Sequence, residues 1–285
     1  MGGSTPVALN IRMKVWLETV PALLQKTSVE HVSIVTHSAG GVYTLNTLAE
    51  LRSILDPKAP YVGLLAPWVP STQSNATLMK FAAKLPANVI DYLSPLQGFI
   101  NSKVAPTLSF SGGLVSSTAI LVGGQKSIDG PVKAGSPEDA AEKYGVDVET
   151  AKILRSLVVK FNLAEDTTGA NEEAKLCLMK GGKADWGALA DYEACIQSIA
   201  DREREGVQAG EVKLRMEAAF ASSDVIIGKG GQEYFEKCWK REGMAGSVDF
   251  ESRTFEGTDH DGVLIDFHKG ALTGIFESVA KRQAP

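Results

Sequence analysis

The sequence has few cysteines, and their spacing excludes several classes of protein. Only three occur among 285 residues, at Cys177, Cys195 and Cys238, and no two of them form a Cys-x-x-Cys pair. This spacing argues against a disulfide framework and against a zinc site. It favours reduced thiols in a cytosol-like compartment, so we expect a cytoplasmic protein.

The sequence also lacks the long charged and apolar runs that mark other classes. Its net charge is −5, it has no basic run, and its aromatic residues are not arranged for stacking, so we expect no nucleic-acid partner. No apolar run is long enough to span a bilayer. Residues 1–8 lack the charged-then-apolar pattern of a signal peptide. No internal repeat is present.

One stretch near the beginning carries a chemical signature. Val32–Val35 is a short apolar run rich in β-branched residues and predicts a buried parallel strand. Ser38 follows closely, then Gly40 and Gly41, and then residues 42–55 with helical spacing. A strand, a sharp turn and a helix form the context of a nucleophile elbow, which lifts a serine hydroxyl clear of the sheet at a helix N-terminus.

The residues Thr36-His37-Ser38-Ala39-Gly40-Gly41 resemble the elbow of the α/β-hydrolase family, written Gly-x-Ser-x-Gly and often with His before the serine. Thr36 stands in place of the first glycine. Strand and helix pack closely there in the family, so the Cβ of Thr36 requires slightly more open packing. A second interpretation remains open at this point, in which Ser38 only caps a helix that follows a parallel strand.

The rest of the chain predicts an α/β fold with a mostly parallel sheet. Further strands are expected at residues 61–66, 212–220 and 248–255, with a closing helix at Val263–Ala280. Residues 71–210 show almost no strand pattern and several helices. By the resemblance, residues 1–70 and 211–285 form an α/β-hydrolase core and residues 71–210 a helical cap over the active site. A separate helical domain without a catalytic role is the alternative.

The resemblance implies a catalytic triad. The family presents its triad in the chain order nucleophile, acid, histidine, with the acid and the histidine on turns after late strands. Asp224 and His260 occupy those places after Ser38. Ser38 is thus the expected nucleophile, His260 the general base, and Asp224 the group that orients the imidazole.

Other residues compete for these roles. His31 precedes its strand and so lies at the wrong end of a parallel sheet, because sites gather at strand carboxyl ends. His37 is next to the serine, and we expect its side chain to point away from the nucleophile. His268 falls inside the expected closing helix. Asp259 and Asp261 flank His260 and offer alternative acids or local salt partners.

The start of the chain departs from the family. In the family, about four strands normally precede the elbow strand. Here some 30 residues precede it, and their pattern predicts one helix. We therefore expect a partial α/β-hydrolase fold that lacks the N-terminal strands, in a truncated or fragmentary chain. One oxyanion donor, the backbone N–H of Ala39, is present, but the family's second donor belongs to the missing segment. Losing one donor lowers the rate on the order of 100-fold, so we expect low or absent activity. Val32–Val35 becomes an apolar edge strand, an opportunity for self-association.

The resemblance implies hydrolysis of an ester or related acyl bond through an acyl-enzyme, as in serine esterases and lipase-like enzymes. It implies no metal and no organic cofactor, and a small-molecule substrate that is partly hydrophobic. A serine nucleophile speaks against epoxide hydrolases and haloalkane dehalogenases, which use Asp. Two alternatives remain. One is a catalytically impaired, hydrolase-like binding protein. The other is a plain α/β domain in which Ser38, Asp224 and His260 do not converge in space.

Overall fold

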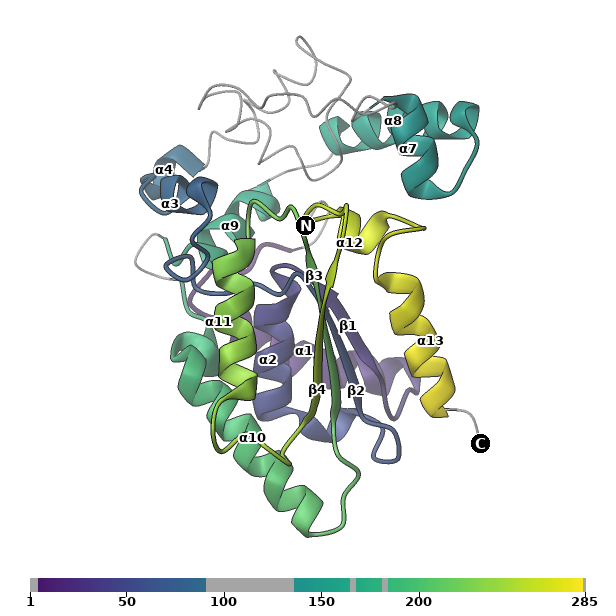
Figure 1. Cartoon of the computed structure of the whole chain (residues 1–285). Coiled ribbons are helices and arrows are strands. Elements are labelled where there is room, and N and C mark those ends of the chain that lie inside the picture. The colour runs from purple at the N-terminus through teal and green to yellow at the C-terminus, as the bar shows by residue number, and fades with distance from the viewer. Residues whose placement is uncertain (1–4, 91–135, 165–167, 181–183, 284–285) are drawn as a thin grey trace.

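The computed structural model describes residues 5–90, 136–164, 168–180 and 184–283. In this part of the chain, four parallel strands form one sheet in chain order (Figure 1). The strands are β1 (Ile34–His37), β2 (Tyr61–Leu65), β3 (Arg215–Ala221) and β4 (Asp249–Phe255). Because all four are parallel, their carboxyl ends meet at one edge of the sheet. This confirms the predicted α/β class with a mostly parallel sheet.

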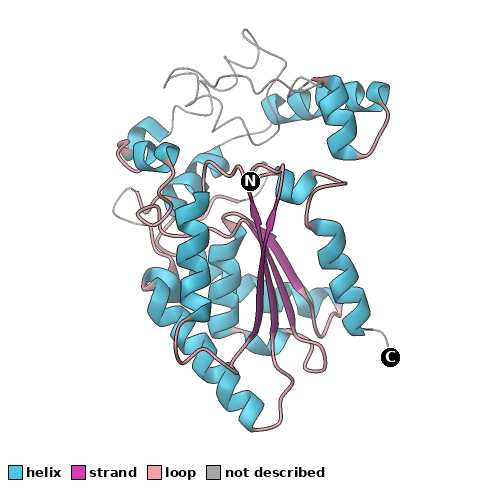
Figure 2. Ribbon diagram, viewed as in Figure 1, coloured by secondary structure: helices cyan, strands magenta, loops and turns pink. Residues whose placement is uncertain are grey.

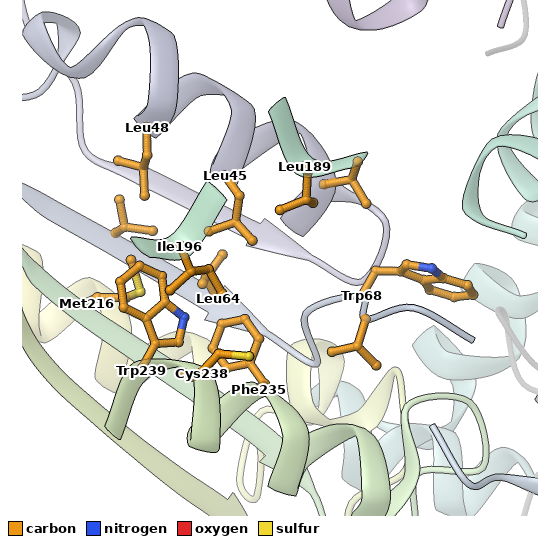
Figure 3. Packing of buried hydrophobic residues seen from close by; sticks show 14 of the residues in the cluster. Leu45, Leu48, Leu64, Trp68, Leu189, Ile196, Met216, Phe235, Cys238 and Trp239 are labelled. Carbon is orange, nitrogen blue, oxygen red and sulfur yellow. The ribbon is translucent and has the colours of Figure 1, made fainter. Parts of the chain in front are cut away.

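Helices cover both faces of the sheet (Figure 2). One face carries α2 (Gly40–Glu50), α10 (Tyr192–Gln208) and α11 (Gly228–Lys240), and the other carries α13 (Leu272–Gln283). An apolar cluster fills the space between α2, α10, α11 and the sheet, with Leu45, Ile196 and Phe235 among its fully buried members (Figure 3). β2 is buried at all five positions, as the apolar run predicts for an inner parallel strand.

The late strands are fixed to this core by aromatic side chains. Phe235 of α11 lies 5.9 Å from the ring of Phe220 in β3 and 6.1 Å from that of Phe250 in β4, measured between ring centroids. Tilted and edge-on pairs of this kind each contribute about 0.5–1.5 kcal/mol beyond their buried area. The packing therefore holds the carboxyl ends of β3 and β4, and the loops that follow them, beside β1 and β2.

Further helical elements complete the described fold. They are α1 (Arg12–Thr27), η1 (Arg52–Ile54), α3 (Thr77–Ala82), α4 (Ala87–Ile90), α7 (Pro137–Tyr144), α8 (Val148–Ala164), α9 (Thr168–Cys177), η2 (Gly187–Ala190) and α12 (Gly262–Ile265). Ser136 caps α7, since its hydroxyl accepts the N–H of Asp139 at 3.1 Å. Figure 1 shows α3, α4, α7 and α8 beyond the carboxyl edge of the sheet. None of the described helices is long and apolar enough to cross a membrane.

One helix of the predicted cap segment packs on the core. α10 falls within residues 71–210, yet it lies against α2 and the sheet. Arg202 donates to the carbonyl of Leu48 at 2.6 Å, and the buried carboxylate of Glu203 receives the guanidinium of Arg52 at 2.6 Å. Residues 91–135 of the same segment lie outside the described residues. The division into core and cap stays a prediction.

The closing helix is not continuous, so the expectation of one helix at Val263–Ala280 is wrong. α12 ends at Ile265 and α13 begins at Leu272. Asp266 makes the break, because its carboxylate accepts the backbone N–H groups of His268 and Lys269 at 3.0 and 2.7 Å. Such a side chain offers the backbone an alternative to helical hydrogen bonds. His268 consequently lies in an exposed turn.

Candidate functional site

The turn after β1 has the strained geometry of an elbow. Ser38 has a φ of 52°, in the left-handed region that non-glycine residues seldom adopt. Its N–H donates to the carbonyl of Leu65 at 2.9 Å, and its carbonyl accepts the N–H groups of Gly41 and Trp68 at 2.9 and 3.1 Å. These bonds join the turn to the end of β2 and project the serine side chain from the carboxyl edge of the sheet.

Glycine at the start of α2 makes room for Thr36 in the elbow. A Cβ on Gly40 would lie 2.9 Å from the Cβ of Thr36, closer than side chains tolerate. The Thr36 hydroxyl lies 3.0 Å from that of Thr44, one of the two donating to the other. Thr36 therefore fits where the family pattern has glycine because Gly40, opposite it, has no side chain. The missing Cβ at Gly40 thus provides the more open packing of strand and helix that the sequence analysis expects at Thr36.

The three residues of the predicted triad lie in one hydrogen-bonded row. The Ser38 hydroxyl is 2.8 Å from His260 Nε2, and His260 Nδ1 is 2.8 Å from Asp224 Oδ2. A carboxylate only accepts hydrogen bonds, so Nδ1–H donates to Asp224 and Nε2 accepts the serine O–H. His260 stands in the loop after β4 and Asp224 in the loop after β3, and both are buried. The convergence disagrees with the plain-domain alternative.

The carboxylate of Asp224 is oriented by backbone groups as well as by the imidazole. Its second oxygen accepts the N–H groups of Ile226 and Ile227 at 2.8 and 2.9 Å. Burial alone would raise the pKa of this carboxyl, but the hydrogen bond and charge of His260 and the two backbone bonds outweigh it and lower the pKa. Asp224 is therefore ionised at neutral pH and can stabilise a positive imidazolium.

His37 contacts the loop that carries His260, residues 256–261, here called the histidine loop. The sequence did not predict this contact. We expected its side chain to point away from Ser38, yet its ring lies 4.8 Å from the His260 ring, centroid to centroid. Its Nε2 is 2.8 Å from the backbone carbonyl of His260. Burial, followed by the nearby His260, lowers the pKa of His37 to about 4. The ring is thus neutral at neutral pH.

Asp261, next to His260, is a buried carboxyl with no hydrogen-bond partner for its side chain among the described residues. It is 9% exposed. Burial raises its pKa to about 6. A carboxylate in this position destabilises the fold once it ionises, since the charges of His260 and Lys143 offset the lost hydration only in part.

The free energy of unfolding should respond to this residue in a defined pH window. The pKa of Asp261 is raised when folded, so its favourable contribution is complete below its unfolded pKa and is lost as pH rises through about 6. We expect Asp261→Asn to be more stable than the wild type at pH 7, by up to about 3 kcal/mol, and equally stable near pH 4. Urea unfolding at both pH values measures this. An equal difference at pH 4 and pH 7 would contradict it.

The remaining candidates lie apart from the row. Asp259 accepts the N–H of Gly262 at 2.7 Å and lies 3.7 Å from the ammonium of Lys143 on α7, so it is a local salt partner, one of the roles considered for it. His31 is exposed ahead of β1 at the opposite end of the sheet. His268 is exposed in the turn after α12, with its ring beside that of Phe267.

A group of donor side chains that could hold a metal shares His260 with the triad. One ligand atom each from His37, His260 and Asp261 lie within 4.8 Å of one another. Both ring nitrogens of His260 already make the hydrogen bonds to Ser38 and Asp224. A metal on His260 would break one of them, so the donor set fits the triad better than an ion.

The start of α2 offers a backbone donor beside the serine. Within the described part of the chain, no hydrogen bond engages the N–H of Ala39, the residue that precedes the first turn of α2. The positive end of the helix dipole adds to its attraction for a developing negative charge. Ala39 therefore stands where the sequence predicts an oxyanion donor.

A hollow is present in the described part of the chain, lined by residues other than those of the row. It has a volume of about 1060 Å³ and is lined by the end of α9, by η2, and by α10 and α11, with Trp186, Tyr192, Tyr234 and Arg241 among its residues. Ser38, Asp224 and His260 do not line it.

Comparison with solved structures identifies the fold of this chain. No family model and no curated protein matches the sequence. Among solved structures, an alpha/beta hydrolase enzyme from a Medee basin deep-sea metagenome library is similar at a TM-score of 0.53 and 9% identity, over 100% of this chain and 77% of that one. An epoxide hydrolase from Vigna radiata is similar at a TM-score of 0.51 and 15% identity, over 98% and 79%. The chain has the α/β-hydrolase fold.

Proposed function

We propose that the protein is a serine hydrolase that cleaves an ester or related acyl bond through an acyl-enzyme. The observation that supports this most strongly is the continuous row Ser38–His260–Asp224, with 2.8 Å at each of its two contacts. A serine hydroxyl is a weak nucleophile without an adjacent base, and the row supplies that base together with the group that orients it.

In the proposed reaction, the Ser38 oxygen attacks the carbonyl carbon of the substrate while His260 Nε2 accepts the hydroxyl proton. The tetrahedral oxyanion lies toward the N–H of Ala39. His260 then gives the proton to the leaving alcohol as the acyl-enzyme forms. A water molecule attacks the acyl-enzyme with His260 again as base, which releases the acid and restores Ser38. Asp224 stabilises the imidazolium in both halves of the reaction.

The proposed substrate is a small molecule with a hydrophobic acyl or alcohol part. This rests on the proposed cap, within which α8 lies beyond the carboxyl edge of the sheet where Ser38 is found. α8 exposes an apolar stripe with helical spacing, formed by Ile153, Leu154, Leu157 and Phe161. Polar substrates would gain little from such a surface, whereas an alkyl or aromatic group would bury area against it.

Ester hydrolysis in a chain-length series tests the proposal. p-Nitrophenyl acetate, butyrate and octanoate are mixed with the purified protein and nitrophenol release is followed. We expect a burst with an amplitude equal to the protein concentration, followed by slower turnover, because acylation precedes deacylation. The rate of the burst should be higher for the longer acyl chains. Release that continues unchanged in a Ser38→Ala variant would contradict the proposal.

A second candidate function is a hydrolase-like binding protein with impaired turnover. The observation that favours it is the oxyanion site, where Ala39 is the one donor that we identify among the described residues. Loss of a second donor costs about 10²–10³-fold in rate. A burst without subsequent turnover, or substrate binding without a burst, supports this candidate.

The proposal includes a reducing, cytoplasm-like compartment. The three cysteines are buried and form no disulfide. Burial raises the pKa of Cys195 and of Cys238 to about 11, so little of the oxidisable thiolate is present at neutral pH. These thiols are inert packing groups and give the fold no covalent reinforcement.

Self-association through β1 is a further part of the proposal. Among the described strands, β1 pairs with β2 alone, and Ile34 and Val35 are only half-buried on it. An apolar strand with an unpaired edge is a template for pairing with another chain. We expect light scattering to give a mass above 30.3 kDa, and Ile34→Lys to reduce it. The matched control Leu23→Lys, at an exposed position of α1, should leave it unchanged. A wild type that stays monomeric at every concentration contradicts the idea.

A further inference from the structure

Two consecutive residues of the elbow each bond to the same residue of the histidine loop. The Ser38 hydroxyl meets the His260 ring at 2.8 Å, and the His37 ring meets the His260 backbone carbonyl, also at 2.8 Å. A carbonyl oxygen only accepts, so His37 donates from Nε2–H and its tautomer is fixed. No other donor reaches this carbonyl within the described ranges. In the described part of the chain, His37 is thus the single polar link that holds the main-chain carbonyl of His260 to the elbow.

The surroundings keep this link intact at neutral pH. His37 lies against the His260 ring and is partly buried, and its pKa of about 4 leaves it neutral at neutral pH. A neutral His37 puts no positive charge beside His260, which itself becomes positive during the proposed reaction. The carboxyls of Asp224 and Asp261 also face this pair and favour positive charge on it; the carboxylate of Asp224 is already bonded to His260.

We propose that His37 is a positioning residue, which holds the backbone of His260 so that Nε2 stays in line with the Ser38 hydroxyl. The proposal rests on the proposed hydrolase function. Residues 37 and 38 are joined by a peptide bond, so the two hydrogen bonds brace the imidazole from its ring and from its backbone. Without the bond from His37, the His260 loop can shift while the fold remains, and a shift of about 1 Å in a catalytic group costs as much as 100-fold in rate.

Three variants separate the hydrogen bond from the bulk of the ring. His37→Phe keeps a ring but has no donor. His37→Gln carries an amide N–H on a chain long enough to reach the position of Nε2, and His37→Asn carries the same amide on a chain that is too short. We expect kcat for ester hydrolysis to fall about 10-fold to 100-fold in His37→Phe and His37→Asn and only a few-fold in His37→Gln. KM should be nearly unchanged in all three variants.

A second readout does not depend on turnover. The Nδ1–H proton of His260 in its bond to Asp224 should give a far-downfield NMR signal. We expect this signal to be sharp in the wild type and in His37→Gln, and to broaden in His37→Phe and His37→Asn. If the wild type shows the signal and no hydrolysis, the proposed function fails while the positioning role can still be judged. If His37→Phe does not fold, the comparison of His37→Gln with His37→Asn decides. Equal kcat and equal signals in Gln and Asn would overturn the proposal.

Discussion

Ser38→Ala is expected to lower kcat for ester hydrolysis by about a millionfold, the loss seen when a serine nucleophile is removed from such a triad. The Ser38 oxygen is the only atom of the row that can form the acyl-enzyme, because His260 and Asp224 act on protons and on charge. The substitution should leave the fold intact. Its hydroxyl makes one hydrogen bond, to His260, and alanine tolerates the positive φ of the elbow about as well as serine does.

Activity measured in parallel for Ser33→Ala provides the matched control. Ser33 lies next to β1, and its hydroxyl is buried with no hydrogen-bond partner among the residues that the structure describes. Its removal should not lower kcat. Circular dichroism and urea unfolding of both variants show whether a lost activity reflects chemistry or unfolding. If Ser38→Ala retained more than a hundredth of the wild-type kcat, a covalent role for Ser38 would be untenable.

Asp224→Asn is expected to lower kcat by about 10⁴-fold. An amide NH₂ in place of the carboxylate oxygen donates toward Nδ1, so the imidazole takes the tautomer with its proton on Nε2. In that tautomer Nε2 can no longer accept the proton of Ser38. The two backbone bonds from Ile226 and Ile227 can still be accepted by the amide oxygen, so the geometry should survive while the base is lost.

Asp259→Asn and Asp261→Asn identify which acid serves His260. Both residues flank His260, but of these three described acids only Asp224 bonds to its ring. We expect each flanking variant to lose less than 10-fold in kcat, against 10⁴-fold for Asp224→Asn. A loss of 10⁴-fold in either flanking variant, with Asp224→Asn near wild type, would reassign the acid.

Much of this arrangement could be predicted because it depends on local patterns and on chain order. The apolar run before Ser38, the small residues after it and the second strand define a βαβ unit whose geometry has few alternatives. Asp224 and His260 could be placed because each follows a late strand, and parallel strands bring their carboxyl ends to one edge. The pattern does not encode the 2.8 Å contacts, which arise from the packing of α11 against β3 and β4.

Other features could not be predicted because they depend on tertiary contacts or on side-chain capping. The position of His37 next to the serine led us to expect that its ring points away from Ser38. Its contacts with His260, more than 200 residues along the chain, depend on the tertiary fold and have no local signal. The helical spacing of residues 263–280 concealed the turn at Asp266, whose carboxylate takes two backbone N–H groups out of the helix. Asp–Phe–His–Lys–Gly was the signal for that turn. No local sequence pattern predicts that α10 packs on α2.

Reaction with a fluorophosphonate, followed by peptide mass spectrometry, tests the central claim most directly. This reagent phosphonylates a serine only when an adjacent base activates it, so it reports the triad without knowledge of the substrate. We predict one adduct per folded chain, on the peptide that contains Ser38, and its loss in His260→Gln. A folded wild type that remains unmodified, or an adduct on a different serine, would contradict the account.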